Sequence, residues 1–161
     1  AVVVTQNDTA VVLFRGGNSV RNAVEEQLAR RGAGKIELLV DLRTKPETPC
    51  ALEAEQSVLA KEMSVNTAQK QKCTPALVEV LRTRNGCLVR LTIGNRQFVT
   101  LSGRVELAQP VSARWLLASL ARPEAVQYKE VLALRRYDWM PGGAVQSSSL
   151  SLRRYGGLRV E

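Results

Sequence analysis

The run Ile-Glu-Leu-Leu-Val-Asp-Leu at residues 36–42 constrains the fold more than any other part of the chain. Five of its seven residues are apolar, and Leu38-Leu39-Val40 are consecutive. A strand formed here would therefore point apolar side chains to both of its faces, and both faces must be covered. This pattern predicts that other elements pack on each side of the strand.

The residues before this run supply a second strand and a helix. Residues 10–14 form a short apolar run that Gly16-Gly17 ends. Asn18 or Ser19 can cap a helix that continues to about Arg31. A glycine follows directly and can adopt the left-handed conformation that ends a helix. Residues 1–49 are therefore predicted to form a strand–helix–strand (βαβ) unit.

Two further helices are predicted in the middle of the chain. Residues 51–71 are rich in Ala, Glu, Gln, Leu and Lys, which favour helices. Their apolar stripe is thin, with Leu52, Leu59 and Met63 as its members, as expected for a helix on a surface or paired with another helix. We expect residues 50–73 to form a helix that links two domains, and a second helix to begin at Thr74.

The remainder of the chain is dominated by strand patterns. Apolar and polar residues alternate over 87–93 and 97–107, with a hairpin turn between them. A helix is predicted from Ser112, and two closing strands over 125–138 and 144–155. The resulting fold class is α+β: residues 74–161 as a two-layer, ferredoxin-like α-β-β-α-β-β domain, its helices on one face of an antiparallel sheet. Four side chains are expected in its core: Val99, Leu101, Val105 and Leu107.

The net positive charge of the chain comes entirely from its second half. The chain carries a net charge of +8, yet residues 1–80 hold ten cations and ten carboxylates, whereas residues 81–161 hold thirteen and five. Twelve of those thirteen cations are arginine, whose planar fork binds carboxylates and phosphates. An acidic protein surface and a nucleic acid are both compatible with this charge.

Aromatic residues and arginines gather on the two closing strands. Tyr, Trp and Arg are enriched in the energetic centres of protein interfaces, and aromatic–arginine faces also bind single-stranded nucleic acids. The signature of RNA-recognition motifs is absent, and a protein partner is the favoured interpretation. The predicted partner-binding residues are Arg135, Arg136, Tyr137, Trp139, Arg153, Arg154 and Tyr155.

The sequence contains no pattern that predicts catalysis, a cofactor or a metal. It has no histidine, which removes the commonest general base and metal ligand. Cys50, Cys73 and Cys87 do not have the spacing of a zinc site. The paired carboxylates at Glu25-Glu26 and at Glu53 and Glu55 are expected on exposed helix faces, where they serve solubility. No apolar run approaches the roughly 18 residues that span a bilayer, so no membrane span is expected.

From Thr74 onward the chain contains Leu77 and Leu81 in a predicted helix, Leu101-Ser102-Gly103, a segment that starts Val111-Ser112, and two closing strands. In these features it resembles the periplasmic domain of PilN-type proteins, inner-membrane assembly components of type IV pili and type II secretion systems. The resemblance implies a non-catalytic, periplasmic protein-binding subunit, anchored in the inner membrane in the full-length protein. It also implies pairing with a similarly folded subunit. A protein partner or a homodimer is expected. A basic nucleic-acid-binding domain, viral or phage-like, is the alternative.

Overall fold

The structure of the chain is a computed structural model. It describes residues 1–43, 46, 48, 50–74, 76–105, 111–118, 126–133 and 149–151, and for residue 104 and the last three strands it describes the backbone alone. The chain divides into two compact units, each considered separately below. The first comprises Ala1–Ser64 and Lys70–Leu77, and the second comprises Val65–Gln69 and Val78–Glu161.

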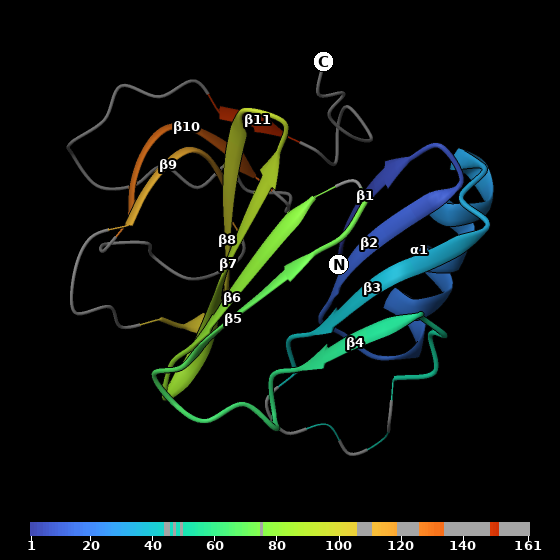
Figure 1. Ribbon diagram of the computed structural model, residues 1–161, viewed down its shortest axis with the longest axis horizontal. Helices are drawn as coiled ribbons and strands as arrows, with labels where there is room; N and C mark the ends of the chain where they lie inside the picture. Colours follow the sequence, from blue (N-terminus) through green and yellow to red (C-terminus); the bar gives the residue numbers. More distant parts are fainter. Residues whose placement is uncertain are drawn as a thin grey trace. The chain divides into compact units, whose positions relative to one another are not determined.

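The first unit contains a four-stranded sheet in the order β1-β2-β3-β4. The strands are β1 (Val2–Gln6), β2 (Thr9–Phe14), β3 (Lys35–Asp41) and β4 (Gln56–Leu59). β1 and β2 form an antiparallel hairpin, whereas β2, β3 and β4 run parallel to one another. The helix α1 (Asn18–Arg31) connects β2 to β3 and covers one face of the sheet (Figure 1). The strand–helix–strand order predicted for the start of the chain is therefore observed, and β1 was not predicted.

Both faces of this sheet are buried, as the apolar run at residues 36–42 predicts. Every residue of β2 is buried. Ala10, Val12 and Phe14 point towards α1, while Val11 and Leu13 point to the opposite face and are at most 1% exposed. A bulge shifts the register of β3, because Ala10 pairs with Ile36 and Val11 with Leu38. The bulged residue Glu37 accepts a hydrogen bond from the backbone N–H of Thr74 at 2.9 Å, so its carboxylate has a partner.

The two ends of α1 are formed by glycines. Gly17 is the N-cap and makes no side-chain cap, so the predicted capping by Asn18 or Ser19 is wrong. At the other end, Gly32 adopts φ 67° and ψ 22°, as predicted. The N–H of Gly32 donates to the carbonyl of Ala29, and the N–H of Ala33 donates to that of Leu28. This pair of hydrogen bonds is a Schellman motif, which satisfies the last carbonyls of the helix.

The second sheet has seven strands in the order β11-β10-β9-β8-β7-β6-β5. The hairpin of β7 and β8 at its centre is antiparallel, with Gly94 at φ 58° in the turn, as the sequence predicts. The pairs β8–β9, β9–β10 and β10–β11 are parallel. The strands are β5 (Ala68–Lys72), β6 (Leu77–Arg82), β7 (Asn85–Ile93), β8 (Arg96–Arg104), β9 (Val111–Ala118), β10 (Val126–Ala133) and β11 (Ser149–Ser151).

The predicted ferredoxin-like α+β fold is wrong. Among the described residues α1 is the only helix, and it belongs to the first unit. The linking helix predicted over residues 50–73 is replaced by β4 and β5, the helix predicted from Thr74 by β6, and the helix predicted from Ser112 by β9. The two closing strands, expected to be antiparallel, contribute the parallel pair β10 and β11. In place of helices on one face of an antiparallel sheet, the described residues form two β-sheets and the single helix α1.

Local patterns explain these differences. In β6, Val78 and Val80 are buried and alternate with the more exposed Leu77 and Glu79, which is a strand period and not a helical one. Over residues 51–71 the favourable helix composition was misleading, because propensity is a weak preference that tertiary packing overrides. The thin apolar stripe was the better signal, since a helix with so few apolar residues gains little from packing.

The core expected in the second unit is present where the structure describes it. Val99 is fully buried and Leu101 is 4% exposed. Val105 is half-buried, and Leu107 lies outside the described residues. The opposite face of β8 is buried as well, through Phe98, Thr100 and Ser102. β8 is thus an interior strand covered on both faces.

The burial of Leu101 predicts that Leu101→Ala lowers the free energy of unfolding by about 2–5 kcal/mol, because it removes buried methyl groups and leaves a cavity. The same substitution at Leu77, which is 40% exposed, is the matched control. We expect it to cost about 0.5 kcal/mol or less. Urea denaturation followed by circular dichroism measures both, and equal effects would contradict the burial of Leu101.

Gly103 provides a second test of the β7–β8 pairing. It has φ 76°, and a Cβ there would lie 2.5 Å from the carbonyl oxygen of Asn85. Gly103→Ala should therefore destabilise the protein by about 1–3 kcal/mol, through backbone strain and the displaced strand. Gly34→Ala is the control, because a Cβ at Gly34 meets only the Asp8 carbonyl oxygen at 4.0 Å. A Gly103→Ala protein as stable as the Gly34→Ala protein would contradict the tight pairing.

Candidate functional site

The predicted partner-binding residues lie outside the described part of the chain. This holds for all seven: Arg135, Arg136, Tyr137, Trp139, Arg153, Arg154 and Tyr155. The neighbouring strand β11 lies at the edge of the seven-stranded sheet. The role of these residues in binding therefore stays a prediction, and the described residues provide a different candidate site.

An open groove of about 680 Å³ lies on the helix side of the first unit. Its sides are α1, the turn that leads into β3, and residues 51–55 of the connection to β4. Leu28, Ile36 and Leu52 line it and are at most 9% exposed, so they form an apolar floor. Its volume falls in the range of natural ligand sites, although the groove is wide open.

Backbone hydrogen bonds hold the groove in shape. The Schellman motif sets Leu28 beside Ala33, and both residues line the groove. The N–H groups of Gly34 and Lys35 donate to the carbonyl of Asp8 at 2.7 and 3.1 Å, which ties the turn to the β1–β2 hairpin. On the other side, the N–H of Glu55 donates to the carbonyl of Ile36 at 2.9 Å. The groove is therefore a preformed feature of the fold.

Three carboxylates and one ammonium group surround the apolar floor. Lys35 Nζ donates to Glu55 Oε1 at 3.1 Å, and this hydrogen bond is the main reason that the pKa of Lys35 is raised. On α1, Oε1 of Glu25 lies 3.7 Å from Nε of Arg21, and this partly exposed ion pair holds Glu25 only weakly. Glu53 makes no ion pair with any described residue. The rim thus offers two weakly compensated carboxylates, one from each side of the groove.

From the sequence, these carboxylates are expected on exposed helix faces without a binding role. Glu25 does lie on a helix, and Glu53 and Glu55 do not. The groove depends on residues 51–55 returning to the helix side of the sheet, where Leu52 joins the core formed with Val24 and Leu28. No local pattern signals that return.

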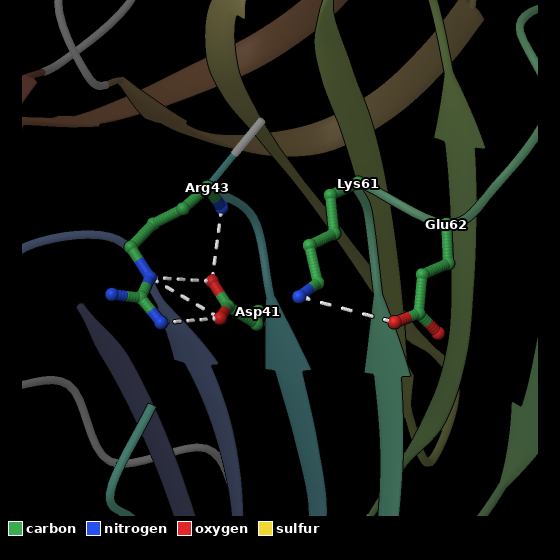
Figure 2. Close-up of polar contacts among 4 residues, drawn as sticks. All are labelled: Asp41, Arg43, Lys61 and Glu62. Atoms are coloured by element: carbon green, nitrogen blue, oxygen red, sulfur yellow. Dashed lines mark hydrogen bonds and ion pairs between the residues drawn. The ribbon is translucent and has the colours of Figure 1, made fainter. Parts of the chain in front are cut away.

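A second polar cluster follows the carboxyl ends of β3 and β4 (Figure 2). The backbone N–H, Nε and Nη2 of Arg43 all donate to the Asp41 carboxylate, the last at 2.7 Å. The hydrogen bond to Asp41 raises the pKa of Arg43, whose guanidinium also lies 5.2 Å over the ring of Phe14. Lys61 and Glu62 form a looser pair at 4.0 Å. Because Asp41 and Arg43 satisfy each other, this cluster stabilises the strand ends and leaves little free charge for a ligand.

The cysteines do not form a site in the described residues. Cys50, Cys73 and Cys87 are free thiols, and no group of three potential metal ligands is present among the residues described. Burial raises the pKa of Cys73, the neighbouring Glu37 adds to the effect, and a hydrogen bond with Ala76 opposes it. The described part of the chain also contains no helix that is long and apolar enough to cross a membrane.

Comparisons with protein-family models, with curated proteins and with solved structures found no match to this chain. The resemblance of the second half to PilN-type proteins stays a prediction.

The Asp41–Arg43 pair yields a stability prediction. Their side chains are 5% and 15% exposed, so Asp41→Asn leaves a partly buried guanidinium without its anion and should cost about 2–4 kcal/mol. Glu26→Gln is the control, because it breaks the exposed pair with Arg30 and should change stability by about 0.5 kcal/mol or less. Chemical denaturation measures the free energy of unfolding of both variants. Equal losses in the two variants would contradict a structural role of the Asp41–Arg43 pair.

The environment of Cys73 predicts slow reaction with alkylating reagents. Only the thiolate reacts, and a raised pKa lowers its fraction at any pH below that value. In the variant Cys50→Ala/Cys87→Ala, only Cys73 can react, and the rate of iodoacetamide labelling should rise with pH. The pH at the midpoint of this rise should be higher for the folded variant than for the same variant in denaturant. An inflection at or below the value for the unfolded chain would show that the thiol is not desolvated.

Proposed function

We propose that this chain is a non-catalytic protein-binding module, and that the groove of its first unit binds a partner segment that combines apolar and cationic side chains. The observation that carries this proposal is the apolar floor with carboxylates on two sides of it. Apolar contacts supply most of the binding free energy at such a surface, and the carboxylates select the charge of the segment.

The chemistry of the rim favours binding over catalysis. A lysine that acts as a base or nucleophile needs a lowered pKa, whereas the pKa of Lys35 is raised by Glu55, so its amine stays protonated. The sequence supplies no histidine to act beside the carboxylates. Glu25, Glu53 and Glu55 are all exposed, which suits attraction of a cation in a wet rim.

The narrower form of this proposal is a subunit of a pilus or secretion assembly platform, located in the periplasm. Its support is the resemblance in the second half of the chain, where Leu101-Ser102-Gly103 lies in a strand as that family pattern expects. The helices that the resemblance also implies are strands β6 and β9 here. The general proposal of a protein-binding module does not depend on them.

Titration with short peptides tests the groove directly. We expect acetyl-Leu-Lys-Lys-Leu-amide to shift NMR signals of Leu28, Ile36 and Leu52, and acetyl-Leu-Glu-Glu-Leu-amide to leave them unchanged. Glu25→Gln/Glu53→Gln should weaken binding of the lysine peptide about threefold to tenfold, since each exposed charge pair contributes about 0.2–1 kcal/mol. Glu62→Gln, which removes an exposed carboxylate outside the groove, should have no effect.

A nucleic-acid-binding module gives a different result. Phosphate contacts by the second-half arginines would produce oligonucleotide binding that weakens steeply with salt. If single-stranded DNA binds in that manner and the lysine peptide leaves the groove signals unchanged, the protein-binding proposal is wrong and the nucleic-acid alternative replaces it.

A further inference from the structure

The tetrapeptide Leu-Arg-Arg-Tyr occurs twice in the second half of the chain, at residues 134–137 and 152–155. Each copy places two guanidinium groups between a leucine and a tyrosine. Six of the seven predicted partner-binding residues lie in these two copies, and the seventh is Trp139. The chain therefore contains two segments that combine apolar and cationic residues, the composition expected of a ligand of the groove in its first unit.

We propose that the groove of one molecule binds a Leu-Arg-Arg-Tyr segment of a second copy of the chain. This inference rests on the proposed function and names the partner. The groove and the segment are complementary in charge and in polarity. The groove has an apolar floor of Leu28, Ile36 and Leu52 and weakly compensated carboxylates at Glu25 and Glu53, while the segment supplies two apolar side chains and two cations.

The choice of arginine matters for the geometry of such a contact. A guanidinium can donate two parallel hydrogen bonds to one carboxylate, whereas an ammonium group acts as a point charge. Two adjacent arginines can serve the two sides of the groove, because Glu25 comes from α1 and Glu53 from the connection between β3 and β4. Tyrosine adds a large apolar ring at a low entropic cost.

The contact joins two different surfaces, so it is head-to-tail. The sequence of each copy contains two Leu-Arg-Arg-Tyr segments besides the residues of this groove, and repeated contacts either close into a ring or continue as a chain of molecules. The uneven charge of the sequence fits this arrangement. The excess of cations lies in residues 81–161, whereas the carboxylates of the groove lie in the electrically neutral first half.

A charge-swap experiment on the full 161-residue chain tests the inference. One variant carries Glu25→Arg/Glu53→Arg, and the other carries Arg135→Glu/Arg136→Glu/Arg153→Glu/Arg154→Glu. In sedimentation velocity the unmodified protein should associate with rising concentration and dissociate at high salt. Each variant alone should lose association at least tenfold, and an equimolar mixture should regain it, because opposite charges meet again in the mixed contact.

Three outcomes would overturn the inference: an unmodified protein that is monomeric at all concentrations, variants that associate as well as it does, or a mixture that fails to associate although circular dichroism shows both variants folded.

A competition experiment with peptides tests the inference even if one of the variants does not fold. Acetyl-Leu-Arg-Arg-Tyr-amide should dissociate the unmodified protein more effectively than its Lys-Lys counterpart, and an inactive peptide overturns the inference. If the protein is monomeric but its groove still binds the lysine peptide, the further inference is wrong and the proposed function stands. If neither self-association nor peptide binding is observed, both are wrong.

Discussion

The parallel pairing of β2 with β3 is the interaction on which the first unit depends. Parallel neighbours cannot be joined by a tight turn, so the chain has to cross over the sheet between them, and α1 is that crossover. The helix buries Val24 and Leu28 against the sheet and ends in the Schellman motif beside β3. The groove exists because the next connection returns to the same face and places Leu52 next to the end of the helix.

The same arrangement separates two kinds of charged group. Asp41 and Arg43 stand at the carboxyl ends of the parallel strands, where burial forces them to satisfy each other. Glu25 and Glu53 stand around the groove, where solvent stabilises them without a strong protein partner. A buried pair contributes to the fold when it is intact and offers nothing to a ligand, whereas exposed carboxylates cost the fold little and can bind a cation. The groove is therefore the more suitable of the two clusters for recognition.

The accuracy of sequence reasoning followed the strength of the local signals. The dense apolar run at residues 36–42, the helix end at Gly32 and the hairpin turn at Gly94 were predicted, since each depends on a few neighbouring residues. Residues 51–71 were misassigned because their helix-favouring composition was given more weight than their scarcity of apolar residues. For the groove, the sequence predicted that Glu25 lies on a helix. No local pattern indicated that residues 51–55 would lie beside that helix.

The sequence by itself determined which segments would be buried, where α1 ends and where the positive charge is concentrated, because composition and short-range patterns set these properties. The tertiary structure alone decided that β3 is bulged, that β9 is a strand, and that Leu52 meets Leu28 and Ile36 under a rim of carboxylates. The physical reason is that strand partners and groove walls are chosen by contacts between residues far apart in the chain. Those contacts gain free energy only after the apolar faces have packed, and no local preference encodes them.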